Sequence, residues 1–146
     1  MSAELRFVFD TNVSVSAAIL KDSAPDLALT KALALGTLVM SADTLAELEE
    51  VLHRPKFSRY LDDDERDLFV SKLVAQASLV DVTVAIKASH DPKDNKFLEL
   101  AVSAQATHIV TGDNDLLVLN PFQGIAILTP HQFLAQFHTT RGPSAE

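Results

Sequence analysis

The sequence predicts an α/β fold, a three-layer α/β/α sandwich whose mostly parallel central sheet has about five strands. Two observations predict it. First, short apolar runs such as Leu5-Arg6-Phe7-Val8-Phe9 are typical of strands buried on both faces of a parallel sheet. Second, segments with helix start and stop signals lie between these runs, so strands and helices alternate along the chain as they do in βαβ units.

Local signals place each element in turn. The predicted strands are 5–9, 37–40, 79–84, 108–111 and 125–128, and the predicted helices are 13–20, 26–35, 42–53, 62–77, 91–105, 113–119 and 130–137. Pro25 suits the first turn of the second helix, and Gly36 ends it. Ser41 is a helix cap, and Pro55 stops the helix that follows. The acidic run 62–65 suits the positive end of the next helix dipole.

Length and composition limit the possible classes of protein. A chain of 146 residues suits one domain, predicted over 1–138, followed by a polar tail at 139–146 that is expected to be flexible. The 12 Lys+Arg against 20 Asp+Glu give a formal charge of -8, which argues against a basic nucleic-acid-binding module unless a cation mediates the contact. The lack of cysteine excludes disulfides, zinc fingers, iron–sulfur clusters and thiol nucleophiles. No signal-peptide pattern and no apolar run of about 18 residues are present, so a soluble, cytoplasmic protein without a membrane partner is expected.

Acidic residues follow the predicted strands, at the sheet edge where parallel α/β proteins bind ligands. Asp10 follows the first strand, Asp91 and Asp94 follow the third after a loop, and Asp113 and Asp115 follow the fourth. The helix after the second strand carries Glu47. Asp10 and Asp113 can alternatively serve only as helix caps or turn residues. The coincidence of acids from four distant segments on one edge favours a site, and a cap and a site residue can be the same side chain.

Helical periodicity bears on Asp94. This residue lies three and four positions before Phe97 and Leu98, and therefore on the apolar face of the predicted 91–105 helix. A carboxylate on a buried face costs several kcal/mol unless it is paired or bound to a metal. The alternative is a helix start in which Asp91 is the cap and Asp94 bonds back to it.

Periodicity also bears on Glu47. It lies beside the apolar stripe of the 42–53 helix and close to the strand end, while Glu49 lies on the other side of that stripe and Glu50 points to solvent. Glu47 is therefore the better candidate to reach over the sheet edge. The alternative is a solvated acidic face with a capping box from Thr44 to Glu47.

Such a carboxylate cluster predicts a divalent-metal site. Several carboxylates packed together cannot all stay ionised without a cation, and an all-oxygen set favours Mg²⁺ or Mn²⁺, here one or two ions. These ions support phosphoryl chemistry and can bridge an acidic surface to a nucleic-acid phosphate. The basic residues near the cluster are candidates to hold a phosphate backbone, or are ordinary solvated side chains: Arg54, Lys56, Arg59, Lys93 and Lys96.

Four motifs occur in a characteristic order: FVFDTNV (7–13), SADTLAELEEVLHRPKF (41–57), DPKDNKFLELA (91–101) and VTGDNDLLVL (110–119). In this order and spacing they resemble the PIN domain family, over about residues 5–134. Within that family the chain is most similar to toxin components of prokaryotic toxin–antitoxin systems, related to VapC toxins.

The resemblance implies a Mg²⁺/Mn²⁺-dependent ribonuclease with a parallel sheet between helices. Asp10, Glu47, Asp94 and Asp113 match the catalytic acids of the family, and Asp115 is an auxiliary metal ligand. Two further residues match positions that support the acids, namely Asn12 and Thr111. The family also implies an RNA substrate, an antitoxin that blocks the site, and a homodimer.

Other classes fit the residues less well. A haloacid-dehalogenase-type phosphatase needs an acid two residues after the first Asp, where this chain has Asn12. A receiver domain needs a Lys beyond the fifth strand, where 124–130 offers none, and a phosphoacceptor Asp after the third, where Thr83 and Val84 stand. A non-catalytic PIN module that binds RNA or a protein partner stays open, because the acids alone do not prove cleavage.

Overall fold

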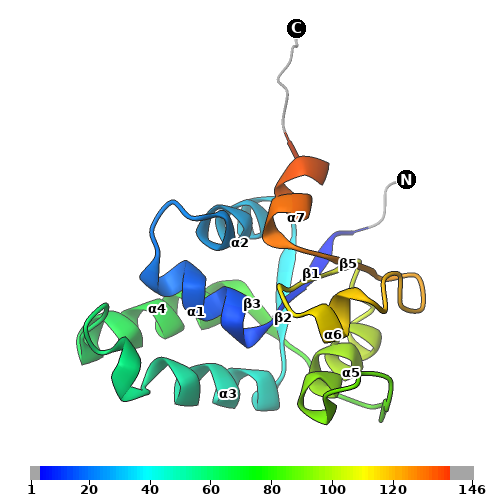
Figure 1. Ribbon diagram of the computed structural model, residues 1–146, viewed down its shortest axis with the longest axis horizontal. Helices are drawn as coiled ribbons and strands as arrows, with labels where there is room; N and C mark the ends of the chain where they lie inside the picture. Colours follow the sequence, from blue (N-terminus) through cyan, green and yellow to red (C-terminus); the bar gives the residue numbers. More distant parts are fainter. Residues whose placement is uncertain (1–3, 139–146) are drawn as a thin grey trace, which may run out of the picture.

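A computed structural model describes residues 4–138 and contains a five-stranded sheet in which all strands are parallel. The strands are β1 (Arg6–Phe9), β2 (Thr37–Met40), β3 (Ala77–Leu79), β4 (His108–Val110) and β5 (Ala126–Leu128), in the order β3-β2-β1-β4-β5. β1 is therefore central, and its Phe7 is in register with Leu38 of β2 and His108 of β4 (Figure 1). Asp10 thus leaves the sheet from its middle strand.

Helices cover both faces of this sheet. They are α1 (Thr11–Ile19), α2 (Ala24–Leu35), α3 (Ala42–Leu52), α4 (Asp63–Gln76), α5 (Asn95–Ser103), α6 (Asn114–Leu117) and α7 (Pro130–Gln136), with short 3-10 turns η1 (Pro55–Phe57) and η2 (Pro92–Asp94). The predicted three-layer α/β/α class is confirmed. No helix within residues 4–138 is both long and apolar enough to cross a membrane.

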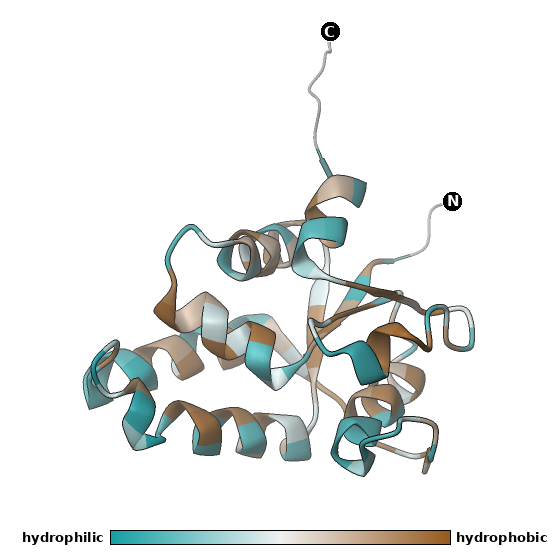
Figure 2. Cartoon of the chain, in the orientation of Figure 1, coloured by the Kyte–Doolittle hydropathy of each residue, from teal (hydrophilic) through white to brown (hydrophobic). Residues whose placement is uncertain are grey.

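The two faces of the sheet carry separate apolar cores. Along β1 the side chains alternate: Phe7 and Phe9 pack in a core with α1, α2, α3, α4 and α7, whereas Val8 packs in a second core with α5 and α6. Figure 1 shows α2 and α7 side by side at one end of the molecule. The tip where α3 leads toward α4 is hydrophilic (Figure 2). Since each face is buried, the strands need to be apolar throughout, as the sequence predicts.

Helix starts follow the predicted capping chemistry. Ser41 and Thr44 form a capping box, in which the N–H of Thr44 donates to Ser41 Oγ (3.1 Å) and the N–H of Ser41 donates to Thr44 Oγ1 (3.0 Å). Asp62 and Glu65 make the same exchange at the start of α4, at 2.8 and 2.9 Å. Gly36 ends α2 as predicted, but its φ of -162° is extended backbone rather than left-handed. A Cβ at this position would collide with the carbonyl oxygen of Leu5, so close approach explains the glycine.

The third strand differs from its prediction over 79–84, since β3 ends at Leu79. Its partner β2 ends at Met40, whose carbonyl accepts the N–H of Val80 (2.8 Å), and the chain then turns into α3. Later residues therefore have no strand to pair with. We call 80–90 the strap, because it crosses α5 without regular secondary structure.

Side chains of α5 bind the strap in place of a neighbouring strand. Ser103 Oγ accepts the N–H of Thr83 (3.0 Å), and Glu99 Oε2 accepts the N–H of Ile86 (2.9 Å). Asn95 Oδ1 accepts the N–H groups of 88 and 89, at 3.2 and 2.9 Å. These three acceptors are spaced four residues apart and so lie on one face of the helix. They fix the path of the chain into the acidic segment that begins at 91.

The predicted helix over 91–105 is divided into η2 and the shorter α5. Asp91 Oδ1 accepts the N–H of Lys93 (3.0 Å), so the predicted cap is confirmed, but the turn it caps is 3-10. The helix predicted over 113–119 is also shorter, as α6. The single domain over 1–138 stays a prediction, and the predicted flexible tail at 139–146 lies outside the described residues.

Candidate functional site

Asp10 is a buried carboxylate at the carboxyl end of β1. Its Oδ1 accepts the N–H of Val13 (2.8 Å) and so caps α1, and its Oδ2 accepts a hydrogen bond from the hydroxyl of Thr111. Only 4% of the residue is exposed. Burial raises the pKa of Asp10 to about 6; the two hydrogen bonds oppose this rise, and the charges of Asp113 and Glu47 add to it. Asp10 is therefore both a helix cap and a carboxylate of the site.

Thr111 joins the ends of β1 and β4. This fully buried residue donates to Asp10, and its Oγ1 also accepts the N–H of Asp113 (3.0 Å). Asp113 Oδ1 in turn accepts the N–H of Asp115 (2.9 Å) and caps α6. A chain of side-chain hydrogen bonds thus connects three acids that come from two strand ends. Thr111 thus contacts two acids of the sheet edge, one through its hydroxyl proton and one through its oxygen.

Asp94 lies opposite these acids at the start of α5. The N–H of Asp91 donates to Ser89 Oγ (3.3 Å), so the predicted alternative in which Asp94 bonds back to Asp91 is wrong. Burial, the carboxyl group of Asp113 and the charges of Asp113, Asp91 and Asp10 raise the pKa of Asp94 to about 7. Its Oδ2 is buried and has no hydrogen-bond partner within the described chain.

Asp91 belongs to the same cluster, although it is not among the predicted site residues. One carboxylate oxygen from each of Asp91, Asp94 and Asp115 lies within 4.8 Å of the others. The sequence places Asp91 after the third strand, but its position before Pro92 favours a helix cap, and no local signal shows that the cap also faces other acids. The strap determines this second role, because it brings Asp91 back beside α6.

Glu47 extends from α3 and forms an ion pair with Lys96 of α5. The exposed fractions of the two side chains are 31% and 28%. Because Thr44 forms its capping box with Ser41, the predicted alternative of a box from Thr44 to Glu47 is wrong. Glu47 lies near enough to Asp10 for its charge to raise the pKa of that carboxyl. The acids predicted on four segments are thus brought to one sheet edge.

The other predicted site residues lie around this cluster. Asn12 is exposed and lines a pocket of about 340 Å³ together with Asp10, Ser16, Gly112 and Asp113. Within residues 4–138 no hydrogen bond joins its side chain to Asp10, which accepts from the N–H of Val13 and the hydroxyl of Thr111 instead. The pocket gives a solvent-filled approach to one side of Asp10.

The candidate phosphate-binding residues divide into two groups. Lys93 and Lys96 flank Asp94 within η2 and α5, whereas Arg54, Lys56 and Arg59 lie around η1, beyond the end of α3. The guanidinium of Arg54 is held by Glu50 at 2.8 and 3.0 Å. The ammonium of Lys56 lies 5.1 Å from the ring centre of Phe57, and the guanidinium of Arg59 lies 5.9 Å from that of Tyr60.

The donor set fits a divalent cation. The oxygen that has no partner, Asp94 Oδ2, is buried among carboxyl groups from α6 and η2. Neighbouring negative charge contributes to the raised pKa values of Asp10 and Asp94, so the repulsion between these carboxylates is not fully offset. Carboxylate oxygens are the ligands that Mg²⁺ and Mn²⁺ prefer. Of the described acids, Asp91, Asp94 and Asp115 lie close enough together to hold such an ion.

The fold and the cluster define a class of α/β protein in which acids gather at the carboxyl edge of an all-parallel sheet. The sequence model of the PIN domain family matches residues 6–115. The chain therefore belongs to the PIN domain family, as its motifs predict.

Solved structures share this fold at low sequence identity. VapBC2 from Rickettsia felis, crystallised with a DNA fragment from its promoter, gives a TM-score of 0.58 at 13% identity, over 84% of this chain and 97% of that one. PAE2754 from Pyrobaculum aerophilum gives a TM-score of 0.59 at 14% identity, over 90% and 88% of the two chains. No curated protein matches the chain. At these identities the likeness concerns the fold.

Proposed function

We propose that the protein is a Mg²⁺- or Mn²⁺-dependent endoribonuclease, the toxin of a toxin–antitoxin pair. The observation that carries this proposal is the convergence of Asp10, Asp94 and Asp113, with Asp94 Oδ2 buried and partnerless. Family membership supports the class of reaction, because PIN domains are generally nucleases. RNA as the substrate follows from the resemblance of the motifs to toxin members of the family.

Within this proposal each acid has a role. Asp10, Glu47, Asp94 and Asp113 are the catalytic acids that hold one or two ions, and Asp115 assists them. When bound, the metal supplies a polarised water and positive charge for phosphodiester hydrolysis. Thr111 keeps Asp10 ionised and correctly oriented by donating to its Oδ2. No side chain needs to act as a covalent nucleophile.

The substrate backbone would be held by basic residues near the cluster. Lys93 comes from the same turn as Asp94, and Lys56 and Arg59 follow the end of α3. Their charges offset part of the repulsion between an acidic protein and RNA phosphates. Contacts of this kind position the RNA backbone and do not read the base sequence.

A protein partner is part of the proposal. VapBC2 from Rickettsia felis is a protein of the same fold that was crystallised with promoter DNA. By analogy, this chain is proposed to bind an antitoxin that covers the acidic edge, and to form a homodimer. A cytoplasmic location suits an enzyme that acts on cellular RNA.

Cleavage of a panel of single-stranded RNAs tests the nuclease. We expect cleavage with Mg²⁺ or Mn²⁺, none with EDTA, and a large loss in Asp10→Asn and Asp94→Asn. Asp64→Asn is a matched control, because it removes the charge of an exposed carboxylate on α4. Unchanged cleavage in both site variants would refute the assignment. RNA binding without metal-dependent cleavage would instead identify a non-catalytic module.

Expression in a bacterial host tests the toxin. Induction of the wild-type chain is expected to stop growth, and induction of Asp10→Asn is not. Co-expression with the protein from an adjacent small reading frame should restore growth and yield a co-purifying complex. Growth arrest that persists in Asp10→Asn would show that toxicity does not depend on the proposed site.

A further inference from the structure

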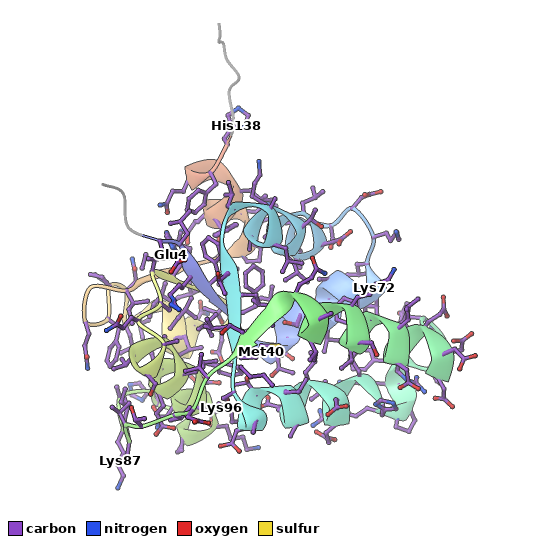
Figure 3. All side chains as sticks on the ribbon, turned by 180° about the vertical axis from the view of Figure 1, so that it is seen from behind. Glu4, Met40, Lys72, Lys87, Lys96 and His138 are labelled. Atoms are coloured by element: carbon purple, nitrogen blue, oxygen red, sulfur yellow. The ribbon has the colours of Figure 1, made fainter. Side chains whose placement is uncertain are left out.

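Lys96 places a positive charge directly on an acid of the proposed metal site. Its ammonium contacts Oε1 of Glu47, although the two residues are 49 positions apart and lie on different helices. Figure 3 labels Lys96 where the strap and α5 pass the first turns of α3. Lys96 is also only two residues from Asp94. The ammonium and the cluster thus occupy the same region of the sheet edge.

The position of this ammonium is constrained on several sides. Lys96 lies in the first turn of α5, and its side chain is less than one-third exposed. Its Nζ lies 5.8 Å from the ring centre of Phe97, within the range of a cation–π contact. By contrast, Lys87 of the strap points away from the molecule (Figure 3). Lys96 is therefore a fixed feature of the site rather than a freely solvated surface charge.

We infer that Lys96 is an internal counter-cation of Glu47, which competes with the divalent ion and keeps metal binding weak in the free protein. The inference rests on the proposed metal-dependent function. Two physical reasons carry it. A carboxylate oxygen that is bonded to an ammonium is not available to a metal, and an ammonium within a few ångströms of a divalent ion repels it. Lys96 acts through Glu47 and is therefore a positioning residue.

The competing physical effect is the orientation of Glu47. Loss of Lys96 frees the Glu47 side chain, and ordering it again on a metal costs some rotamer entropy. The repulsion between a unit charge and a divalent ion at this range is larger than that cost, even at the dielectric of a protein surface. Removal of the ammonium should therefore strengthen metal binding.

Calorimetric titration with Mn²⁺ alone tests the inference without reference to catalysis. Lys96→Met is expected to bind Mn²⁺ about tenfold more tightly than the wild type, because it removes the repelling charge while keeping much of the side-chain volume. Lys96→Arg keeps the charge and is expected to bind like the wild type. Lys93→Met removes an exposed charge nearby and should change the affinity much less. Equal gains in the Lys93 and Lys96 variants would overturn the inference, because they would indicate only a general field effect.

A double-mutant cycle tests whether Lys96 acts through Glu47. The gain in Mn²⁺ affinity from Lys96→Met should be smaller in a Glu47→Gln background, because only the direct repulsion between the ammonium and the ion remains there. A merely structural bridge between α3 and α5 predicts a different result, in which Lys96→Met lowers the melting temperature and leaves Mn²⁺ affinity unchanged or weaker. That result would overturn the inference. If Lys96→Met does not fold, Lys96→Gln serves in the same titrations.

The outcome for the wild type separates this inference from the proposed function. Mn²⁺ binding by the wild type without a gain in Lys96→Met overturns only the role of Lys96. A lack of Mn²⁺ binding by the wild type and by both Lys96 variants overturns the metal site, and the inference with it. Binding by Lys96→Met alone would support the inference in its strongest form.

Discussion

The hydroxyl of Thr111, at the end of β4, donates a hydrogen bond to Oδ2 of Asp10, at the end of β1. The two residues are 101 positions apart, and both are buried. The same hydroxyl oxygen accepts the N–H of Asp113 (3.0 Å). One small side chain thus holds two acids of the site in a fixed relation and offsets part of the burial penalty of Asp10.

Replacement of Thr111 by valine keeps the shape but removes the hydroxyl. Asp10 Oδ2 then loses its donor and the N–H of Asp113 its acceptor, so the free energy of unfolding should fall by about 1–3 kcal/mol. The pKa of Asp10 should rise further, and Mn²⁺ should bind more weakly near neutral pH. Urea unfolding and Mn²⁺ titration measure both effects. Thr111→Ser keeps the hydroxyl and should lose much less; equal losses in the two variants would contradict the prediction.

The stability of the metal-free protein should decrease as the pH rises. The pKa values of Asp10 and Asp94 are raised from 3.8 to about 6 and about 7, so the folded chain holds these protons more tightly than the unfolded chain. Their favourable contribution is complete below 3.8 and is lost as the pH rises toward about 7. Urea midpoints measured in EDTA across this range test the direction.

The control for this pH dependence is the double variant Asp10→Asn/Asp94→Asn. Because its amides do not titrate, its urea midpoint should depend less on pH over the same range. A wild-type midpoint that rises steadily over that range would show that these two carboxyl groups are not held protonated by the fold.

A divalent ion should stabilise the folded protein. Mn²⁺ at about 100 times its dissociation constant adds about 2.7 kcal/mol to the free energy of unfolding, if it binds only the folded state. Melting curves with and without Mn²⁺ measure this gain. Glu47→Gln should reduce it, whereas Glu49→Gln, an exposed neighbour on α3, should not. A gain that is equally large in Glu47→Gln would exclude Glu47 from the metal site.

The basic residues should differ in their contributions to RNA binding. Arg54 is already paired with Glu50, so Arg54→Ala should weaken binding less than Lys93→Ala, whose charge lies beside Asp94. A plot of log K against log salt concentration has a negative slope. Each lost phosphate contact should make that slope shallower by about 0.7 for a single strand. Fluorescence anisotropy over a salt series, with Asp10→Asn as the background to prevent cleavage, measures the slopes. A steeper slope in Lys93→Ala than in its parent would contradict the assignment.

Close approach at Gly36 should make any side chain there costly. A Cβ would collide with the carbonyl oxygen of Leu5, which also accepts the N–H of Thr37 (3.0 Å) beside the sheet. Gly36→Ala should therefore lower the free energy of unfolding by about 1–3 kcal/mol. A Cβ at Gly112 would meet nothing within 4 Å, so Gly112→Ala is the control in the same urea titration. Similar losses in both variants would contradict a collision specific to Gly36, because the change from Gly to Ala by itself restricts the unfolded chain and does not lower stability.

Local sequence signals predicted most of the elements because their causes act over a few residues. The Ser41 and Asp62 caps and the uninterrupted apolar run of β1 are examples. The third strand was placed too late because Leu79–Val84 has strand-like residues, whereas strand pairing also needs a partner, and β2 ends at Met40. That constraint comes from a different part of the chain.

The acids of the site were predictable for a similar reason. Asp10, Asp113 and Asp115 follow parallel strands directly, and such strand ends meet at one edge of the sheet. Asp91 was not among the predicted site residues because its position before Pro92, and its bond to the N–H of Lys93, are fully explained by a role as helix cap. Lys96 was predicted as a candidate phosphate contact, and its pairing with Glu47 joins residues 49 positions apart, which no local pattern encodes.

The sequence by itself determined the layered α/β class, the edge of the sheet that carries the acids, and the absence of thiol ligands in a chain without cysteine. Only the tertiary structure decided which oxygens have partners: Asp10 bonds to Thr111, Glu47 to Lys96, and Asp94 Oδ2 to none within the described chain. The physical reason is the distance along the chain over which each effect acts. Periodicity and capping act within a few residues, whereas burial and side-chain pairing depend on how helices from distant segments pack on the sheet.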